Sequence, residues 1–169
     1  MLTINRVLVP TDFSESSAAA LDYGRALCRR FGSTLLLMHV VETQGFTNVV
    51  ASSGYAAVIP DLFEEIVAGE RARLESLVTD EDRQVFNVET VCRVTGRPAR
   101  EIVHYGADAK ADLIVMGTHG RQGLSHLVLG SVAEEVVRTA GCPVLTVKPS
   151  APGLGLDAAR QTTVVASPA

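Results

Sequence analysis

The chain has 169 residues, of which 47% are hydrophobic and 20% charged, so it can bury one hydrophobic core and is too apolar to remain disordered. Its formal net charge of −4 disfavours nucleic acid as a partner, because a general nucleic-acid binder needs a basic face to neutralise phosphates. The three cysteines are widely spaced and form no CxxC pair, which suits a reducing compartment. No signal peptide is visible and no apolar stretch reaches about 18 residues, so we expect a cytoplasmic protein that does not enter a membrane.

Short apolar runs alternate with longer amphipathic stretches along the chain. The apolar runs predict strands at residues 4–10, 34–41, 112–117 and 143–147. Apolar and polar residues alternate over 85–94, which predicts a strand nearer an edge of the sheet. The amphipathic stretches predict helices from a Ser14 cap to a stop at Gly32, from Asp61 to about Val78, from Arg97-Pro98 onward, and from Ser131 to Thr139. Pro10 is expected to end the first strand, because proline cannot donate a hydrogen bond to a neighbouring strand.

This order of strands and helices predicts an α/β fold with one open parallel sheet and helices on both of its faces. Such sheets bind ligands beyond the carboxyl ends of the strands, where the strand order reverses, so functional residues should follow the strands. Residues 42–59 have no clear period and are expected to form a long loop. Residues 149–169 are rich in proline and glycine and are expected to be a flexible tail outside a single domain of residues 1–148.

The segment Pro10-Thr11-Asp12 lies just past the first expected strand, at the end where ligands bind. The Asp12 carboxylate could accept hydrogen bonds from the hydroxyl groups of a sugar or from the amine of adenine. Alternatively, Asp12 serves with Ser14 only as a cap for the helix that follows. Position alone does not decide between a ligand contact and a cap.

The segment from Gly117 to Ser131 follows the fourth expected strand and contains several glycines. Glycines allow the backbone to approach a ligand closely, and the Gly130-Ser131 pair stands where a helix should begin. The backbone N–H groups and the dipole at a helix N-terminus favour phosphate, to which Ser131 would add a hydroxyl and Arg121 a positive charge. The alternative is a glycine-rich surface loop in which Ser131 only caps its helix.

Several established motifs are absent from the chain. It has no GxxxxGK[ST] phosphate loop, and no GxGxxG pattern follows the first strand, so a dinucleotide-binding site is not supported. It also lacks the GxSxG nucleophile elbow and the HExxH zinc motif. His39 lies inside an apolar strand and is expected in the core, whereas His119 has no acid at a fixed spacing to orient it. We therefore assign no catalytic residue and no metal site.

The spacing Gly117-x2-Gly120-x9-Gly130-Ser131 resembles the nucleotide-binding signature of the universal stress protein family, in its ATP-binding branch. Four further segments resemble the same family in the same order, namely residues 7–14, 37–40, 112–117 and 142–147. The resemblance covers about residues 2–148 and so identifies the expected domain, residues 1–148, as a universal stress protein domain.

The resemblance implies a five-stranded parallel sheet of order 3-2-1-4-5, a Rossmann-like fold similar to that of the adenine nucleotide alpha hydrolases. It also implies a role for each matching residue. Pro10, Thr11 and Asp12 match the residues that meet the adenosine, and the backbone of Val40 matches the position that contacts the adenine edge. Met116 and Gly117 match the floor beneath the nucleoside. The residues that match the phosphate cradle are Gly120, Arg121, Gly130, Ser131 and Val132.

The function implied is an ATP-binding regulatory module of the cellular stress response, with magnesium accompanying the nucleotide. At most slow ATP hydrolysis is expected, because no P-loop lysine and no evident Walker-type aspartate accompany the glycines. One alternative is an ATP-using nucleotidyl or phosphoryl transferase on a related fold, although its HxGH or SGGxDS loop is absent. Another is an interaction protein without a ligand, although the glycine signature is intact. The resemblance also favours a homodimer through the fifth strand, which the order 3-2-1-4-5 places at a sheet edge.

Overall fold

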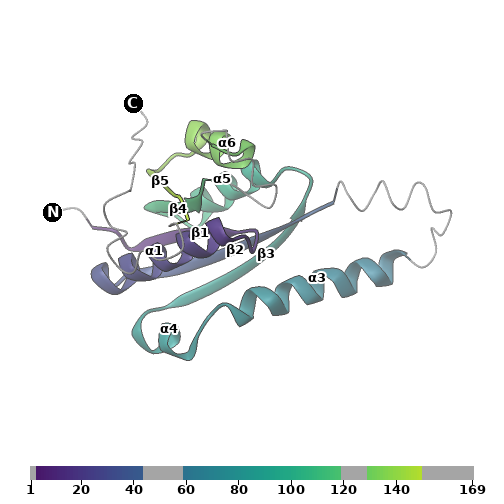
Figure 1. Ribbon diagram of the computed structural model, residues 1–169, viewed down its shortest axis with the longest axis horizontal. Coiled ribbons are helices and arrows are strands. Elements are labelled where there is room, and N and C mark those ends of the chain that lie inside the picture. The colour runs from purple at the N-terminus through teal and green to yellow at the C-terminus, as the bar shows by residue number, and fades with distance from the viewer. Residues whose placement is uncertain (1–2, 44–58, 119–128, 150–169) are drawn as a thin grey trace.

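The computed structural model describes residues 3–43, 59–118 and 129–149 of the chain (Figure 1). The strands form one parallel sheet in the order β3-β2-β1-β4-β5, which confirms the predicted α/β fold and strand order. Their bounds are β1 (Arg6–Thr11), β2 (Thr34–Glu42), β3 (Val88–Thr95), β4 (Leu113–Gly117) and β5 (Val144–Val147). The predicted tail from residue 150 onward and residues 44–58 of the predicted loop lie outside the described residues.

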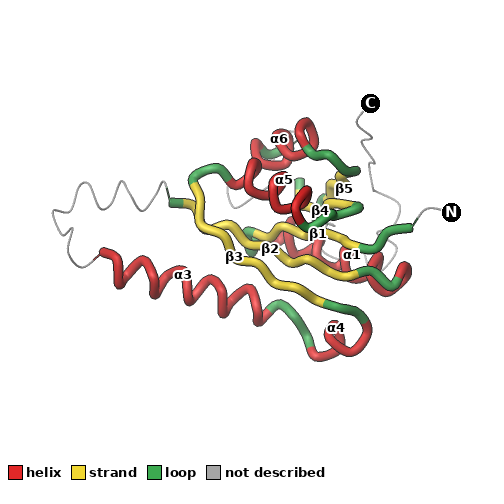
Figure 2. Tube along the Cα trace, turned by 180° about the vertical axis from the view of Figure 1, so that it is seen from behind, coloured by secondary structure: helices red, strands yellow, loops and turns green. Residues whose placement is uncertain are grey.

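Helices cover both faces of the sheet, as predicted (Figure 2). Their bounds are α1 (Glu15–Phe31), α3 (Ile59–Ser76), α4 (Asp80–Val85), α5 (Pro98–Asp108) and α6 (Ser131–Thr139). Alternate residues of β1 point to opposite faces, so Val7 and Val9 pack in the core beneath α1 and α3, whereas Leu8 packs in the core beneath α5 and α6. None of the helices in the described part of the chain is long and apolar enough to cross a membrane.

The first helix begins and ends where its capping residues predict. Ser14 Oγ accepts a hydrogen bond from Ser17 N at 3.2 Å, and Gly32 adopts the left-handed conformation (φ 69°) that closes the helix. At the N-terminal end of α1, Ser16 Oγ donates to the carbonyl oxygen of Val147 at 3.5 Å. The first turn of α1 therefore lies against the carboxyl ends of the strands.

Pro10 does not end the first strand, because β1 continues through Thr11 and pairs with β2 along its whole length. Arg6 accepts from Asp112 N, so Arg6 and every second residue after it face β4. The pairing of β1 with β4 extends only to Leu8, opposite Ile114. The ring nitrogen of Pro10 thus points toward β4, to which it cannot donate, so the proline ends the pairing with β4 but not the strand, which continues on its β2 side.

The strand predicted over residues 85–94 begins later, because a short helix precedes it. In α4, Thr79 Oγ1 accepts from Asp82 N and the Asp82 carboxylate accepts from Thr79 N, which is a complete capping box. The strand β3 starts only at Val88 and lies at the edge of the sheet, as its alternating pattern predicted. The preceding helix, α3, begins at Ile59 rather than at Asp61.

Candidate functional site

The strand order reverses between β1 and β4, which are neighbours in the sheet. The loop after β1 and the start of α6 both lie at the carboxyl ends of these strands. Gly130 N donates to the carbonyl oxygen of Thr118 at 2.7 Å, and Thr118 N donates to that of Val147 at 3.0 Å. These bonds fasten the first residues of α6 directly to the ends of β4 and β5, where a parallel sheet of this type binds its ligands.

Asp12 supports the N-terminus of α1. Its Oδ1 atom accepts from the Ser14 hydroxyl at 2.6 Å and from Ser14 N at 3.1 Å. Burial alone would raise the pKa of this half-buried carboxyl, but the hydrogen bonds from the Ser14 side chain and backbone outweigh it, so the pKa is lowered. Asp12 is therefore an anion that helps to cap the helix, as the alternative interpretation held, and its contact with adenosine remains a prediction.

Gly117, the predicted floor beneath a nucleoside, is also needed for packing. A Cβ atom at this position would lie 2.5 Å from Ser16 Oγ and 2.8 Å from the carbonyl carbon of Ser16. Glycine thus lets the first turn of α1 approach the end of β4. The neighbouring Met116 is 5% exposed and packs with Leu8 and Met38 in the core beneath α5 and α6.

Gly130 and Ser131 form the start of α6. Gly130 is the N-cap and, as a glycine, has no side chain with which to cap the helix. Ser131 is the first helical residue rather than the cap, so the interpretation of Ser131 as a cap is wrong. Gly130 has ordinary extended angles (φ −72°, ψ 155°), which any residue adopts, so its backbone gives no reason for glycine. The N–H groups at the start of a helix favour an anion, so this end of α6 is suited to receive phosphate.

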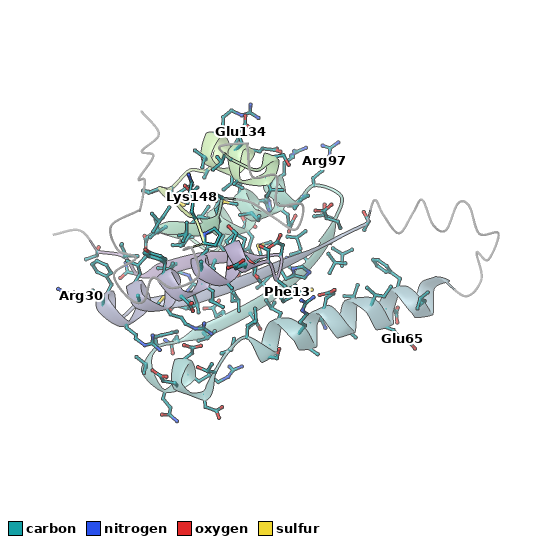
Figure 3. All side chains as sticks on the ribbon, viewed as in Figure 1. Phe13, Arg30, Glu65, Arg97, Glu134 and Lys148 are labelled. Atoms are coloured by element: carbon teal, nitrogen blue, oxygen red, sulfur yellow. The ribbon has the colours of Figure 1, made fainter. Side chains whose placement is uncertain are left out.

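A cavity of about 470 Å³ opens beside the start of α6. Its lining comprises Glu42 of β2, Gly96, Arg97, Pro98, Ala99 and Arg100 at the start of α5, and Ser131, Val132 and Glu135 of α6. Two arginines, Arg97 and Arg100, therefore lie beside two residues of the predicted phosphate cradle, and Figure 3 shows Arg97 at the surface near α6. Within the described residues, neither guanidinium group makes an ion pair or a hydrogen bond. The Arg97-Pro98 pair predicts only the opening of a helix, so the placement of Arg97 beside α6 could not be read from the sequence.

The other predicted site residues fall into two groups. Pro10, Thr11 and Val40 lie at the carboxyl ends of β1 and β2, beside one another in the sheet but outside the lining of the cavity. Gly120 and Arg121 lie outside the described residues. Among residues 3–43, 59–118 and 129–149, no group of three His, Cys, Asp or Glu side chains is placed to hold a metal ion.

The comparisons with known proteins agree on one family. A model of the universal stress protein family matches residues 3–148. The universal stress protein MJ0531 of Methanocaldococcus jannaschii is 35% identical over 143 residues, which are 85% of this chain and 81% of that protein. The solved structure of MJ0577, a protein of the same organism, superposes with a TM-score of 0.76 at 29% identity and covers 89% of this chain and 99% of that one. A universal stress protein solved in complex with cAMP shares the fold at 24% identity, with a TM-score of 0.54 over 88% of this chain and all of that one.

Proposed function

Because the chain belongs to the universal stress protein family, we propose that it binds ATP, together with magnesium, at the carboxyl ends of β1 and β4. In this proposal it is a cytoplasmic regulatory module of the stress response that hydrolyses ATP slowly at most. The start of α6 carries the proposal: its N-cap is a glycine, which brings no side chain of its own to the first N–H groups, and it is fastened to the ends of β4 and β5. The cAMP complex of a structural relative supports an adenine nucleotide as the ligand.

In this proposal the adenosine of the ligand would lie at the ends of the strands and its phosphates at the start of α6. Pro10, Thr11 and Asp12 would meet the adenosine, the backbone of Val40 would meet the adenine edge, and Met116 with Gly117 would form the floor. The phosphates would meet Gly120, Arg121, Gly130, Ser131 and Val132. The helix dipole and the N–H groups of α6 favour negative charge there, and magnesium would offset the charge of the phosphates. The chain offers no P-loop lysine to this end, so slow hydrolysis is the most that we propose.

Titration calorimetry and thermal unfolding with Mg-ATP test the proposal. A ligand that binds only the folded state stabilises it by about 2.7 kcal/mol at a hundred times its Kd. For a chain of this size that corresponds to a rise in Tm of about 5–10 °C. Parallel titrations with GTP and cAMP measure the preference among nucleotides. The absence of both a thermal shift and a heat of binding at millimolar Mg-ATP would overturn the proposal.

The substitution Gly130→Val locates the site. Its side chain would occupy the space in front of the α6 N–H groups, so ATP binding should be lost while the fold, measured by circular dichroism, persists. Gly141→Val is the matched control, because Gly141 lies just beyond the other end of α6 and a Cβ there meets nothing within 4 Å. Undiminished ATP affinity in Gly130→Val would remove Gly130 from the site.

We also propose that two copies of the chain pair through β5. This strand lies at the edge of the sheet, pairs with β4 on one side and carries no charged residue. Pro143 and Val147 accept hydrogen bonds from the β4 side, so the N–H group of Thr146, at an alternate position, points outward. Sedimentation should give twice 17.9 kDa for the wild type and 17.9 kDa for Thr146→Pro. A wild-type mass of 17.9 kDa with and without ATP would rule out the dimer.

A further inference from the structure

Phe13 lies directly after Asp12, in the loop between β1 and α1, and has a left-handed backbone (φ 65°). Bulky residues rarely adopt this conformation, because the Cβ atom meets the backbone, so the surrounding structure must hold Phe13 there. Thr11 Oγ1 accepts from Phe13 N at 3.0 Å, which fixes the backbone from one side. The ring of Phe13 must be held by other elements.

Two side chains enclose the Phe13 ring. The imidazole of His39, on β2, lies 4.4 Å from it between centroids, and the guanidinium carbon of Arg73, on α3, lies 4.0 Å from the ring centroid. A cation over an aromatic face at this distance is attracted to it. Figure 3 shows Phe13 between the sheet and α3, which is the place where these contacts form. The ring thus ties the loop after β1 to a helix that contributes no residue to the predicted nucleotide contacts.

The same elements also hold the residue before Asp12. His39 Nδ1 lies 2.8 Å from the carbonyl oxygen of Thr11, and since a carbonyl only accepts, Nδ1 carries the hydrogen. The other ring nitrogen of His39 lies 3.8 Å from Glu70 Oε2, and this carboxylate oxygen lies 3.9 Å from Arg73 Nη1. Glu70 and Arg73 are one turn apart on α3, so both reach the loop from one helix face.

We propose that Arg73 and Glu70 are positioning residues for the adenosine of the bound nucleotide, acting through Phe13 and His39. This inference rests on the proposed function. Asp12 lies between Thr11, whose carbonyl is bound by His39, and Phe13, whose ring is enclosed, so these contacts hold the backbone on both sides of Asp12 while Ser14 holds its carboxylate. Without Arg73, the backbone of Phe13 relaxes out of the left-handed region and turns Asp12 away. The phosphate end stays as it is, because α6 lies on the other face of the sheet.

The substitution Arg73→Ala tests this inference, with Arg71→Ala as the matched control. The Arg73 side chain is 54% exposed, so its removal should leave the fold intact. Arg71 is an exposed residue of the same helix and makes no hydrogen bond or ion pair within the described residues. We expect Mg-ATP to bind Arg73→Ala about tenfold more weakly, inorganic tripolyphosphate to bind as to the wild type, and Arg71→Ala to match the wild type for both. Equal ATP affinity in Arg73→Ala and the wild type would overturn the inference.

A measurement without any ligand separates this inference from the proposed function. Hydrogen exchange at the amides of Phe13 and Ser14 should be faster in Arg73→Ala than in the wild type and unchanged in Arg71→Ala. Wild-type protein that binds no ATP would refute the proposed function, whereas unchanged exchange in Arg73→Ala would refute the positioning of the loop by α3.

Two substitutions of Phe13 itself separate its ring from its backbone. Phe13→Gly allows the left-handed conformation and removes the ring, so it should weaken ATP binding as Arg73→Ala does. Phe13→Tyr keeps the ring and should retain the wild-type affinity. Wild-type affinity in Phe13→Gly would show that the enclosed ring is not needed and would overturn the inference.

Discussion

Replacing Gly117 by alanine should destabilise the fold through a contact that involves no ligand. The new Cβ would lie 2.5 Å from Ser16 Oγ and 2.8 Å from the Ser16 carbonyl carbon. The hydroxyl could rotate away, but the carbonyl carbon belongs to the backbone in the first turn of α1. Either the helix or the strand must therefore shift.

The magnitude follows from the atoms that must move. Overpacking a well-packed site costs about 1–3 kcal/mol, and a clash with backbone belongs to the upper half of that range, about 2–3 kcal/mol. In a chain of 150–250 residues, each kcal/mol lowers the Tm by about 2–4 °C. The expected fall in Tm for Gly117→Ala is thus about 4–12 °C.

Thermal unfolding followed by circular dichroism measures this fall. Gly141→Ala is the matched control, because its Cβ would meet nothing within 4 Å and its Tm should stay within about a degree of the wild type. An unchanged Tm in Gly117→Ala would refute the packing argument. If that stable variant had also lost ATP binding, Gly117 would be a ligand residue and not a packing residue.

Three further predictions concern single side chains. Asp82 is 1% exposed and paired with Arg25, so Asp82→Asn should cost about 3 kcal/mol, at the lower end for a broken buried pair. Burial alone would raise the pKa of Asp82, but hydrogen bonds from Thr79 and Arg25 lower it, so this stabilisation is present above about pH 4 and is lost as the pH falls through the lowered pKa. The difference in unfolding free energy between Asp82→Asn and the wild type should therefore be smaller at about pH 3 than at about pH 7, and an equal difference would contradict this. Burial, with a smaller effect of Asp82, raises the pKa of the Cys28 thiol to about 12, so a thiol reagent at pH 8 should label Cys28 only after unfolding, and labelling in the folded state would contradict this. Asp12→Ala should weaken ATP binding more than tripolyphosphate binding in calorimetry, and equal losses would move Asp12 away from the nucleoside.

The features of the fold that depend on local signals could be predicted from the sequence. Ser14 and Gly32 mark the ends of α1 because capping depends on residues within one turn. The alternating pattern at 85–94 predicted an edge strand, and β3 lies at the edge. The strand order came from the family resemblance, since an alternation of strands and helices is compatible with several orders.

Two predicted strand ends were wrong: the end of the first strand at Pro10 and the start of the third strand at residue 85. Proline removes a hydrogen bond on one side of a strand only, and because Pro10 faces β4, the pairing with β2 carries β1 on to Thr11. The capping box of Thr79 and Asp82 was legible in the sequence, but the apolar residues after it favoured a strand that started too early. At Pro10 the answer depends on which element lies alongside, whereas at Thr79 a local signal was overruled by the apolar pattern that follows it.

The sequence pattern also does not show what surrounds each glycine of the candidate site. Gly117 and Gly130 belong to one spacing pattern, yet the structure separates them by what surrounds each. A side chain at Gly117 would clash with Ser16, a residue far earlier in the chain. Packing by itself is therefore a sufficient reason for glycine at this position. Gly130 has ordinary backbone angles, so its backbone conformation does not require glycine. A substitution at Gly117 would change packing as well as any ligand contact, so the loss of ATP binding is tested more cleanly at Gly130 than at Gly117.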